Sequence, residues 1–184
     1  MKKNFDPFPN LITTRLVLRQ LDVRDMDEFF ILKSDKRLLK YYAPIGKTYD
    51  ESYRKLQELN ADIKDGESIT WGITMKNYNK LIGTVCFWNF SEEEYKAEIG
   101  YELMIEMQGK GIMKEALEAV IEYGFNYMQL NVIEAVPDPN NESSVRLLER
   151  NNFIKGESFI ETYGFNGEIV RRVTYRLMNI KGNI

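Results

Sequence analysis

The sequence predicts a single α/β domain, residues 1–184, in which a mixed sheet is flanked by helices. In several short segments apolar residues alternate with polar ones, which is the pattern of strands. In other segments they recur at helical spacing, and the two kinds of segment are interspersed in the order β-α-α-β-β-β-α-β-α-β-β. The length suits one hydrophobic core, and the sequence contains no repeats or linkers.

Residues that cap or break regular structure set the expected bounds. Asp22 is a favoured helix N-cap, and Gly66 is placed to end the second helix. Pro137 stops a strand, and Asn166-Gly167 is a strong signal for a two-residue hairpin. Residues 1–12 are interpreted as a proline-containing lead-in. The expected strands are 15–19, 68–75, 80–87, 95–104, 132–136, 157–163 and 168–178, and the expected helices are 22–32, 50–64, 110–128 and one from 142 or 143 to just before Asn152.

The segment after the strand 95–104 has the features of an anion-binding turn. Gly109 and Gly111 flank Lys110, and an amphipathic helix follows. Glycines let backbone N–H groups approach an anion, and a helix N-terminus adds unpaired donors and a partial positive charge. Neither the nucleoside-triphosphate loop nor the dinucleotide fingerprint fits, since Gly111 follows Lys110 directly and Lys114 stands where a third glycine is required. The interpretation is a phosphorylated cofactor; a plain tight turn is the alternative.

Composition excludes several classes of function. The net charge of −3 argues against general nucleic-acid binding. The chain has no histidine, so the usual general base and the commonest metal ligand are absent and no metal is expected. The single cysteine, Cys86, is interpreted as a small buried hydrophobe without a catalytic role. No apolar run has the length of a membrane span and the first residues lack a secretory pattern, so a cytoplasmic protein is expected.

Several segments resemble one family in the same order along the chain. Gln108-Gly109-Lys110-Gly111-Ile112-Met113 resembles the Q/R-x-x-G-x-G/A signature of the GCN5-related N-acetyltransferases, the GNAT superfamily. Ala97-Glu98-Ile99-Gly100-Tyr101 resembles the segment that precedes this signature. The segments 14–19 and 141–153 resemble the branch that includes the N-terminal (alanine) acetyltransferases of ribosomal proteins.

The resemblance implies a fold, a cofactor and a set of binding residues. The implied sheet is mostly antiparallel, has about seven strands, is splayed in the middle and is flanked by about four helices. Acetyl-CoA is the implied co-substrate: its pyrophosphate would lie at 109–113 and its pantetheine arm along the strand 95–104, which typically carries a bulge in this family. The implied cofactor-binding residues are Tyr101, Glu102, Leu103, Gln108, Gly109, Lys110, Gly111, Ile112, Met113 and Asn141.

The catalytic residues are also interpreted through the resemblance. Without histidine, a carboxylate acting through water is the expected base, with Glu98 first and Glu102 and Glu161 as alternatives. Ser144 falls on the position that in the ribosomal branch is proposed to protonate or bind the departing sulfur. Many members carry a tyrosine where this chain has Leu148, which leaves that role to Ser144 or to water. The alternative for both Asn141 and Ser144 is helix capping.

The acceptor stays open at this stage. The resemblance favours N-acetylation of a primary amine, with a ribosomal-protein N-terminal α-amine as one acceptor. Tyr163 and Arg171 stand where some ribosomal-branch members carry acids, which keeps a small amine (a polyamine, an amino acid or an aminoglycoside) as an alternative. A CoA-binding module without turnover is the rival in another class. Tyr41, Tyr42 and Tyr49 are candidates for the acceptor wall, and the resemblance leaves a homodimer open.

Overall fold

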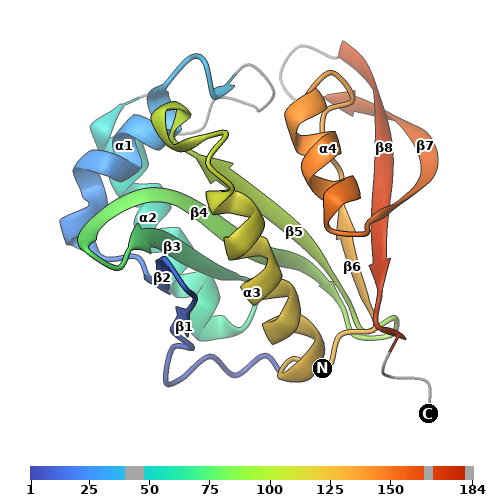
Figure 1. The fold of residues 1–184 in the computed structure, drawn as a ribbon, viewed down its shortest axis with the longest axis horizontal. Coiled ribbons are helices and arrows are strands. Elements are labelled where there is room, and N and C mark those ends of the chain that lie inside the picture. Colours follow the sequence, from blue (N-terminus) through green and yellow to red (C-terminus); the bar gives the residue numbers. More distant parts are fainter. Residues whose placement is uncertain (40–47, 164–167, 181–184) are drawn as a thin grey trace.

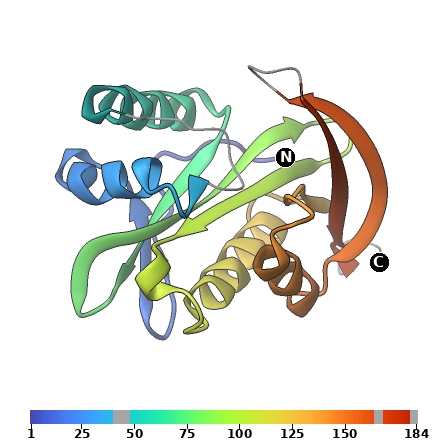
Figure 2. The ribbon, with the colours of Figure 1, turned by 90° about the horizontal axis from the view of Figure 1, so that it is seen from above.

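The computed structural model describes residues 1–39, 48–163 and 168–180. It contains an eight-stranded sheet in the order β1-β2-β3-β4-β5-β6-β8-β7, antiparallel throughout except between β5 and β6. Helices α1 and α2 cover one face of the sheet, and α3 and α4 cover the other (Figures 1 and 2). The strands are β1 (Leu11–Ile12), β2 (Leu16–Gln20), β3 (Ile69–Met75), β4 (Tyr78–Ser91), β5 (Lys96–Leu103), β6 (Val132–Ala135), β7 (Ile154–Tyr163) and β8 (Glu168–Met178), and the helices are η1 (Val23–Asp25), α1 (Met26–Ser34), α2 (Tyr49–Asp65), η3 (Ile105–Met107), α3 (Ile112–Asn126) and α4 (Glu142–Arg150).

The predicted fold class is confirmed, and strands β4 and β7 are longer than predicted. The N-terminal part of the chain also differs locally. The expected lead-in contains a short additional strand, β1, because Leu11 and Ile12 pair with Leu18 and Val17 of β2. The helix expected over 22–32 starts as the 3-10 turn η1 before it continues as α1. Asp22 caps this turn as predicted.

The sheet packs against a hydrophobic core on each face. Trp71 and Phe87 are fully buried in the larger core, together with the inner face of α3. Phe29 and Leu32 of α1 lie in the smaller core on the opposite face. No helix among the described ranges is long and apolar enough to cross a membrane.

Strand β5 keeps the predicted alternation along its whole length. Ala97, Ile99 and Leu103 are buried in the core that contains α3. Glu98 and Glu102 occupy the alternate positions of the strand, which face the other side of the sheet. The pairing of β4 with β5 runs without a shift from Gly83↔Leu103 to Trp88↔Glu98, and the register changes only beyond Trp88. The bulge that the resemblance implied for this strand is therefore absent from its pairing with β4, and the parity of β5 is not inverted.

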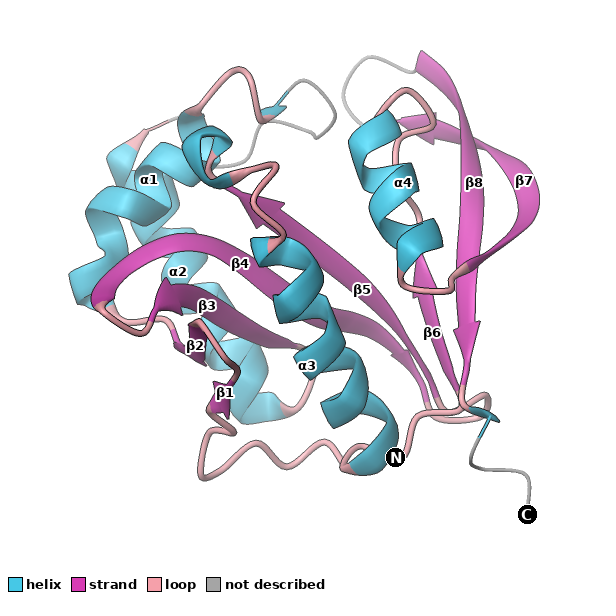
Figure 3. Ribbon diagram, in the orientation of Figure 1, coloured by secondary structure: helices cyan, strands magenta, loops and turns pink. Residues whose placement is uncertain are grey.

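The parallel pair β5–β6 is short and then opens. Three residue pairs join the two strands, from Lys96↔Val132 to Glu98↔Glu134. Strand β5 continues to Leu103, but β6 ends at Ala135, followed closely by Pro137 and Pro139, which cannot extend a ladder. The strands diverge from there, as Figure 3 shows. The implied splay in the middle of the sheet is confirmed. Helix α3 follows β5, and helix α4 follows β6.

Candidate active site

A cavity of about 360 Å³ lies at the open end of the splay. Its walls come from the C-terminal half of β5, the turn that follows, the start of α3, and α4. The lining residues include most of those predicted for the cofactor, and Ser144: they are Arg37, Leu38, Tyr101, Glu102, Leu103, Ile105, Gln108, Gly109, Gly111, Ile112, Met113, Lys114, Asn141, Ser143, Ser144, Arg146, Leu147 and Arg150.

The glycine turn has the backbone shape that the sequence suggested. Gly109 and Gly111 have φ values of 73° and 72°, a left-handed conformation that favours glycine. Gly111 is the N-cap of α3 and offers no side-chain hydrogen bond, whereas Thr48 and Asn141 cap α2 and α4 with their side chains. The first N–H groups of α3 thus meet the cavity without a capping side chain from Gly111.

The wall formed by β5 is held by polar contacts on both sides. The Glu102 carboxylate accepts hydrogen bonds from Lys33 Nζ at 2.5 Å and from Thr84 Oγ1 at 2.9 Å. The Leu103 carbonyl accepts one from Gln108 Nε2 at 3.0 Å. Gln108, predicted as a cofactor contact, thereby also fixes the turn to the end of β5.

A pair of hydroxyl groups spans the splay. Tyr101 Oη and Ser144 Oγ lie 2.8 Å apart, and Ser144 is only 8% exposed. Asn141 Oδ1 accepts hydrogen bonds from the Ser144 N–H at 3.2 Å and from Ser143 Oγ at 2.7 Å, so Asn141 does cap α4. Leu148 is fully buried in the core. The tyrosine hydroxyl beside Ser144 thus comes from β5, a side-chain contribution that the sequence did not predict.

Two predicted site residues lie outside the cavity lining among the described residues. Glu98 belongs to the same alternate set of β5 as Glu102, and the Asn89 amide donates to it at 3.4 Å. Lys110 is exposed, and its carbonyl, not its ammonium group, has a structural contact, with Arg15. The predictions for Tyr41 and Tyr42, and for the side chains of Glu161 and Tyr163, fall outside the described part of the structure.

Tyr49 and Arg172 make contacts with other parts of the protein. Tyr49 lies against α1, where its hydroxyl donates to Asp27 at 3.2 Å and its ring packs on Phe30. Arg172 is buried, with a guanidinium nitrogen 3.8 Å from Asp138, whereas Arg171 is exposed.

The sequence did not single out the basic residues of the cavity. Arg146 and Arg150 come from α4, Lys114 from α3 and Arg37 from the segment after α1. Arg146 pairs with Glu142, Lys114 with Glu118, and Arg37 with Asp35 and Glu106. The i, i+4 spacing of Arg146 and Arg150 behind the Asn141 cap was the available signal for the α4 pair.

The fold and the site together define an acyltransferase: a splayed sheet, an uncapped helix start after a glycine turn, and a cavity between them. Residues 15–154 match the family model described as "Acetyltransferase (GNAT) domain". The chain is 34% identical over 149 residues to the uncharacterized N-acetyltransferase YoaA of Bacillus subtilis, covering 80% of this chain and 84% of that protein. The chain belongs to the GNAT acetyltransferase family.

The names of other similar proteins specify an acceptor. The [Ribosomal protein uS5]-alanine N-acetyltransferase of Escherichia coli is 31% identical over 166 residues, which cover 85% of this chain and 84% of that protein. Among solved structures, the ribosomal L7/L12 α-N-protein acetyltransferase RimL in complex with coenzyme A has a TM-score of 0.81 at 20% identity, covering 92% of this chain and 98% of that one. At this identity the structural likeness concerns the fold.

Cys86 lies on β4 opposite Gly100 of β5, on the sheet next to the site. Although the residue as a whole is half-buried, burial of its thiol raises the pKa to about 11. At pH 8 roughly 0.1% of the native thiol is then ionised, against about a quarter of an ordinary cysteine. Iodoacetamide should therefore label Cys86 on the order of a hundredfold more slowly in the native than in the denatured protein.

The pH dependence of the labelling rate distinguishes a raised thiol pKa from steric protection of Cys86. Because the neutral thiol is favoured in the folded protein, the native labelling rate, followed by mass spectrometry, should rise about tenfold per pH unit between pH 8 and 10. If the labelling rate of the native protein levels off near pH 9, the Cys86 thiol has an ordinary pKa.

Proposed function

We propose that this protein transfers the acetyl group of acetyl-CoA to the α-amine of a protein N-terminus, of the kind found on ribosomal proteins. The observation that carries the proposal is the cavity that joins the left-handed glycine turn, the start of α3, the C-terminal half of β5 and α4. The acceptor class is supported by the relative that acetylates the alanine of ribosomal protein uS5. The proposal takes residues 1–184 as one domain that acts in the cytoplasm, where ribosomal proteins and acetyl-CoA occur together.

The residues of the cavity fit a CoA molecule. Gly109 and Gly111 present backbone without Cβ atoms, and the start of α3 supplies N–H donors and a partial positive charge for a pyrophosphate. The basic side chains of α3 and α4 add charge of the required sign. The part of the cavity between the C-terminal half of β5 and α4 can take a narrow chain such as pantetheine. When bound, acetyl-CoA supplies a thioester whose acetyl carbon is open to attack by an amine.

The acceptor amine must be neutral to attack, and the chain offers carboxylates for that proton. The Glu102 carboxylate is already engaged by two donors, Lys33 Nζ and Thr84 Oγ1. Glu98 therefore remains the first candidate to accept the proton through water, with Glu161 as the alternative. An α-amine, with a pKa near 8, needs little help; an alkylamine, near 10, needs more.

We expect the Tyr101–Ser144 pair to act on the leaving group, the sulfur of CoA. When the carbon–sulfur bond breaks, the departing thiolate needs a proton or a hydrogen-bond donor. Ser144 lines the cavity, and a hydrogen bond with the Tyr101 phenol orients its hydroxyl. Ser144 would give its hydroxyl proton to the sulfur and take one from the Tyr101 phenol, which would regain a proton from water. This arrangement supplies the tyrosine that position 148 lacks.

The proposal is tested with the unmodified protein, acetyl-CoA and a set of amines. A peptide with a free N-terminal alanine should release CoA thiol and gain one acetyl group at its α-amine, as seen by mass spectrometry. Four other amines should react at least about tenfold more slowly. They are spermidine, free alanine, an aminoglycoside, and the same peptide with a blocked N-terminus and an internal lysine. Turnover of the small amines alone contradicts the proposed acceptor, and binding of CoA without turnover of any amine contradicts the proposed reaction.

The role of Ser144 can be separated from capping. Ser144→Ala should lower kcat by about 10²-fold, the lower end for a lost proton donor, with a small change in CoA affinity. Tyr101→Phe should lower kcat less, because Ser144 keeps its own hydroxyl. Since Asn141 provides the side-chain cap of α4, Ser144→Ala should leave the melting temperature nearly unchanged. Full activity in Ser144→Ala would refute the catalytic role.

The base can be tested through the pH dependence of the rate. Glu98→Gln should lose most of the rate at neutral pH and recover as pH rises, because more acceptor is then already neutral. Glu102→Gln, a change of the same shape on the same strand, removes a partner of Lys33 and should leave the pH profile of kcat in place. A loss in Glu98→Gln that is uniform at every pH assigns Glu98 a structural role.

A further inference from the structure

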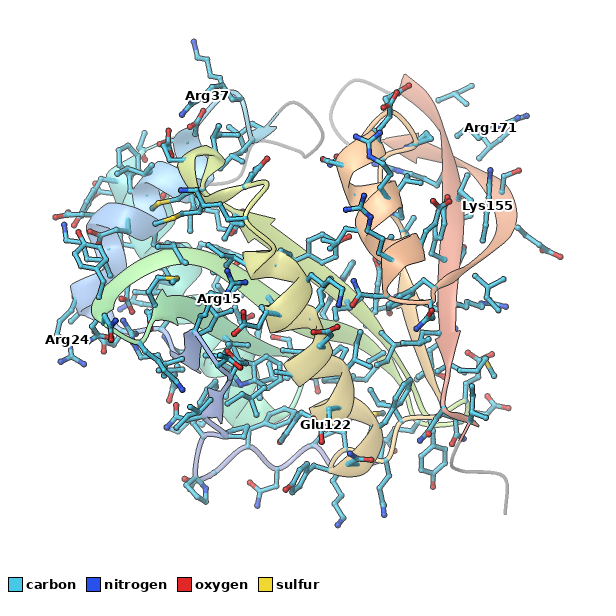
Figure 4. All side chains as sticks on the ribbon, viewed as in Figure 1. Arg15, Arg24, Arg37, Glu122, Lys155 and Arg171 are labelled. Carbon is cyan, nitrogen blue, oxygen red and sulfur yellow. The ribbon has the colours of Figure 1, made fainter. Side chains whose placement is uncertain are left out.

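A polar network ties the N-terminal segment to the glycine turn. Arg15, immediately before β2, donates from Nη1 to the Lys110 carbonyl at 3.0 Å and from Nε to Glu115 Oε2 at 2.6 Å. Its backbone N–H donates to Glu115 Oε1 at 2.7 Å, and Thr13 Oγ1 donates to the same oxygen at 2.6 Å. Figure 4 shows Arg15 beside the start of α3. Arg15 does not line the cavity, so it holds the turn from outside.

The contact with Lys110 fixes the orientation of one peptide group. In a planar trans peptide the C=O of one residue and the N–H of the next point in opposite directions. By holding the Lys110 carbonyl, Arg15 directs the Gly111 N–H away from itself. Gly111 is a lining residue of the cavity and the N-cap of α3. A side chain about one hundred residues away in sequence thus sets the direction of a donor in the glycine turn.

The contact with Glu115 concerns charge. Glu115 lies in the first turn of α3, where its carboxylate weakens the attraction of that helix end for an anionic ligand. Partial burial by itself opposes ionisation of Glu115, but hydrogen bonds from Thr13 and Arg15 outweigh it, so its pKa lies below the ordinary value. The carboxylate is therefore ionised at neutral pH. The Arg15 guanidinium offsets this charge from the outer side of the turn, opposite the cavity in which a pyrophosphate would bind.

We infer that Arg15 is a positioning residue for the pyrophosphate group of CoA, acting through the Lys110–Gly111 peptide and through the charge of Glu115. The inference rests on the proposed function, in which residues 109–113 receive that pyrophosphate. It assigns Arg15 no contact with the acetyl group or the acceptor, so its effect is on cofactor affinity and not on the chemical step.

The test compares ligands that contain or lack the pyrophosphate. Calorimetric titration should give Arg15→Gln a Kd for CoA raised about tenfold, the size expected from one charge-assisted hydrogen bond. The Kd for dephospho-CoA, which keeps the pyrophosphate, should rise by the same factor. With acetyl-pantetheine as donor, kcat/KM should not change. Steady-state kinetics should show a raised KM for acetyl-CoA at unchanged kcat.

Two further variants of the network refine this test. Arg15→Lys keeps the positive charge, but it lacks the planar guanidinium that contacts Glu115 and the Lys110 carbonyl at the same time. Its affinity for CoA should therefore lie between that of the unmodified protein and that of Arg15→Gln. Arg15→Gln combined with Glu115→Gln should recover part of the lost affinity, because the uncompensated carboxylate is gone. No recovery in the double variant contradicts the charge half of the inference.

Arg19→Gln is the matched control. Arg19 lies on β2, pairs with the buried Asp25 through two nitrogens at 2.7 and 2.8 Å, and is not a lining residue of the cavity. This variant loses an ion pair that is more buried than Arg15–Glu115, which makes it a stringent control for general destabilisation; provided that it is folded, it should bind CoA as the unmodified protein does. A similar loss of CoA affinity in Arg19→Gln, or a similar loss with acetyl-pantetheine in Arg15→Gln, shows a general loss of structure and overturns the inference.

The outcome for the unmodified protein separates the two claims. If it binds no CoA, the proposed function fails and the inference fails with it. If it binds CoA and Arg15→Gln binds CoA equally well, only the role of Arg15 is refuted.

Discussion

The arrangement of this molecule depends on how soon β5 and β6 part. Backbone ladders normally continue as far as two strands run together, because each N–H and C=O needs a partner. Here the ladder stops after three residue pairs. Both strands run in the same direction, so the helices that follow them, α3 and α4, begin at the same open end. The cavity, with the positive ends of two helices near it, is a consequence of that divergence.

The walls of the cavity are fixed by contacts that reach across elements. Lys33 and Thr84 hold Glu102, Gln108 holds the end of β5, and Tyr101 meets Ser144 over the splay. The side chains that face the cavity are therefore oriented before any ligand arrives, which lowers the entropic cost of binding and keeps donors at fixed positions. The turn itself is braced from its outer side, where Arg15 meets Lys110 and Glu115.

The elements that the sequence predicted well are those set by neighbours in the chain. Asp22 and Gly66 occupy their expected cap positions, and Asn152 adopts a left-handed backbone, with φ of 63°, which asparagine tolerates at a helix end. The continuous segment 108–113 supplied most of the predicted lining because one turn places its residues together. The short β1 was missed because its two residues carry no periodicity of their own and are strands only through β2.

The amino-acid sequence by itself determined the order of the strands after β1 and of the four α-helices, the caps Asp22 and Gly66, the faces of β5 and the family, since these depend on residue types and on spacings of a few positions. Only the tertiary structure decided which side chains meet. Tyr101 and Ser144 are 43 residues apart, Lys33 and Glu102 are 69 apart, and Arg15 and Lys110 are 95 apart. No local periodicity encodes such pairs, because the register of the sheet and the packing of helices on it bring them within hydrogen-bonding distance.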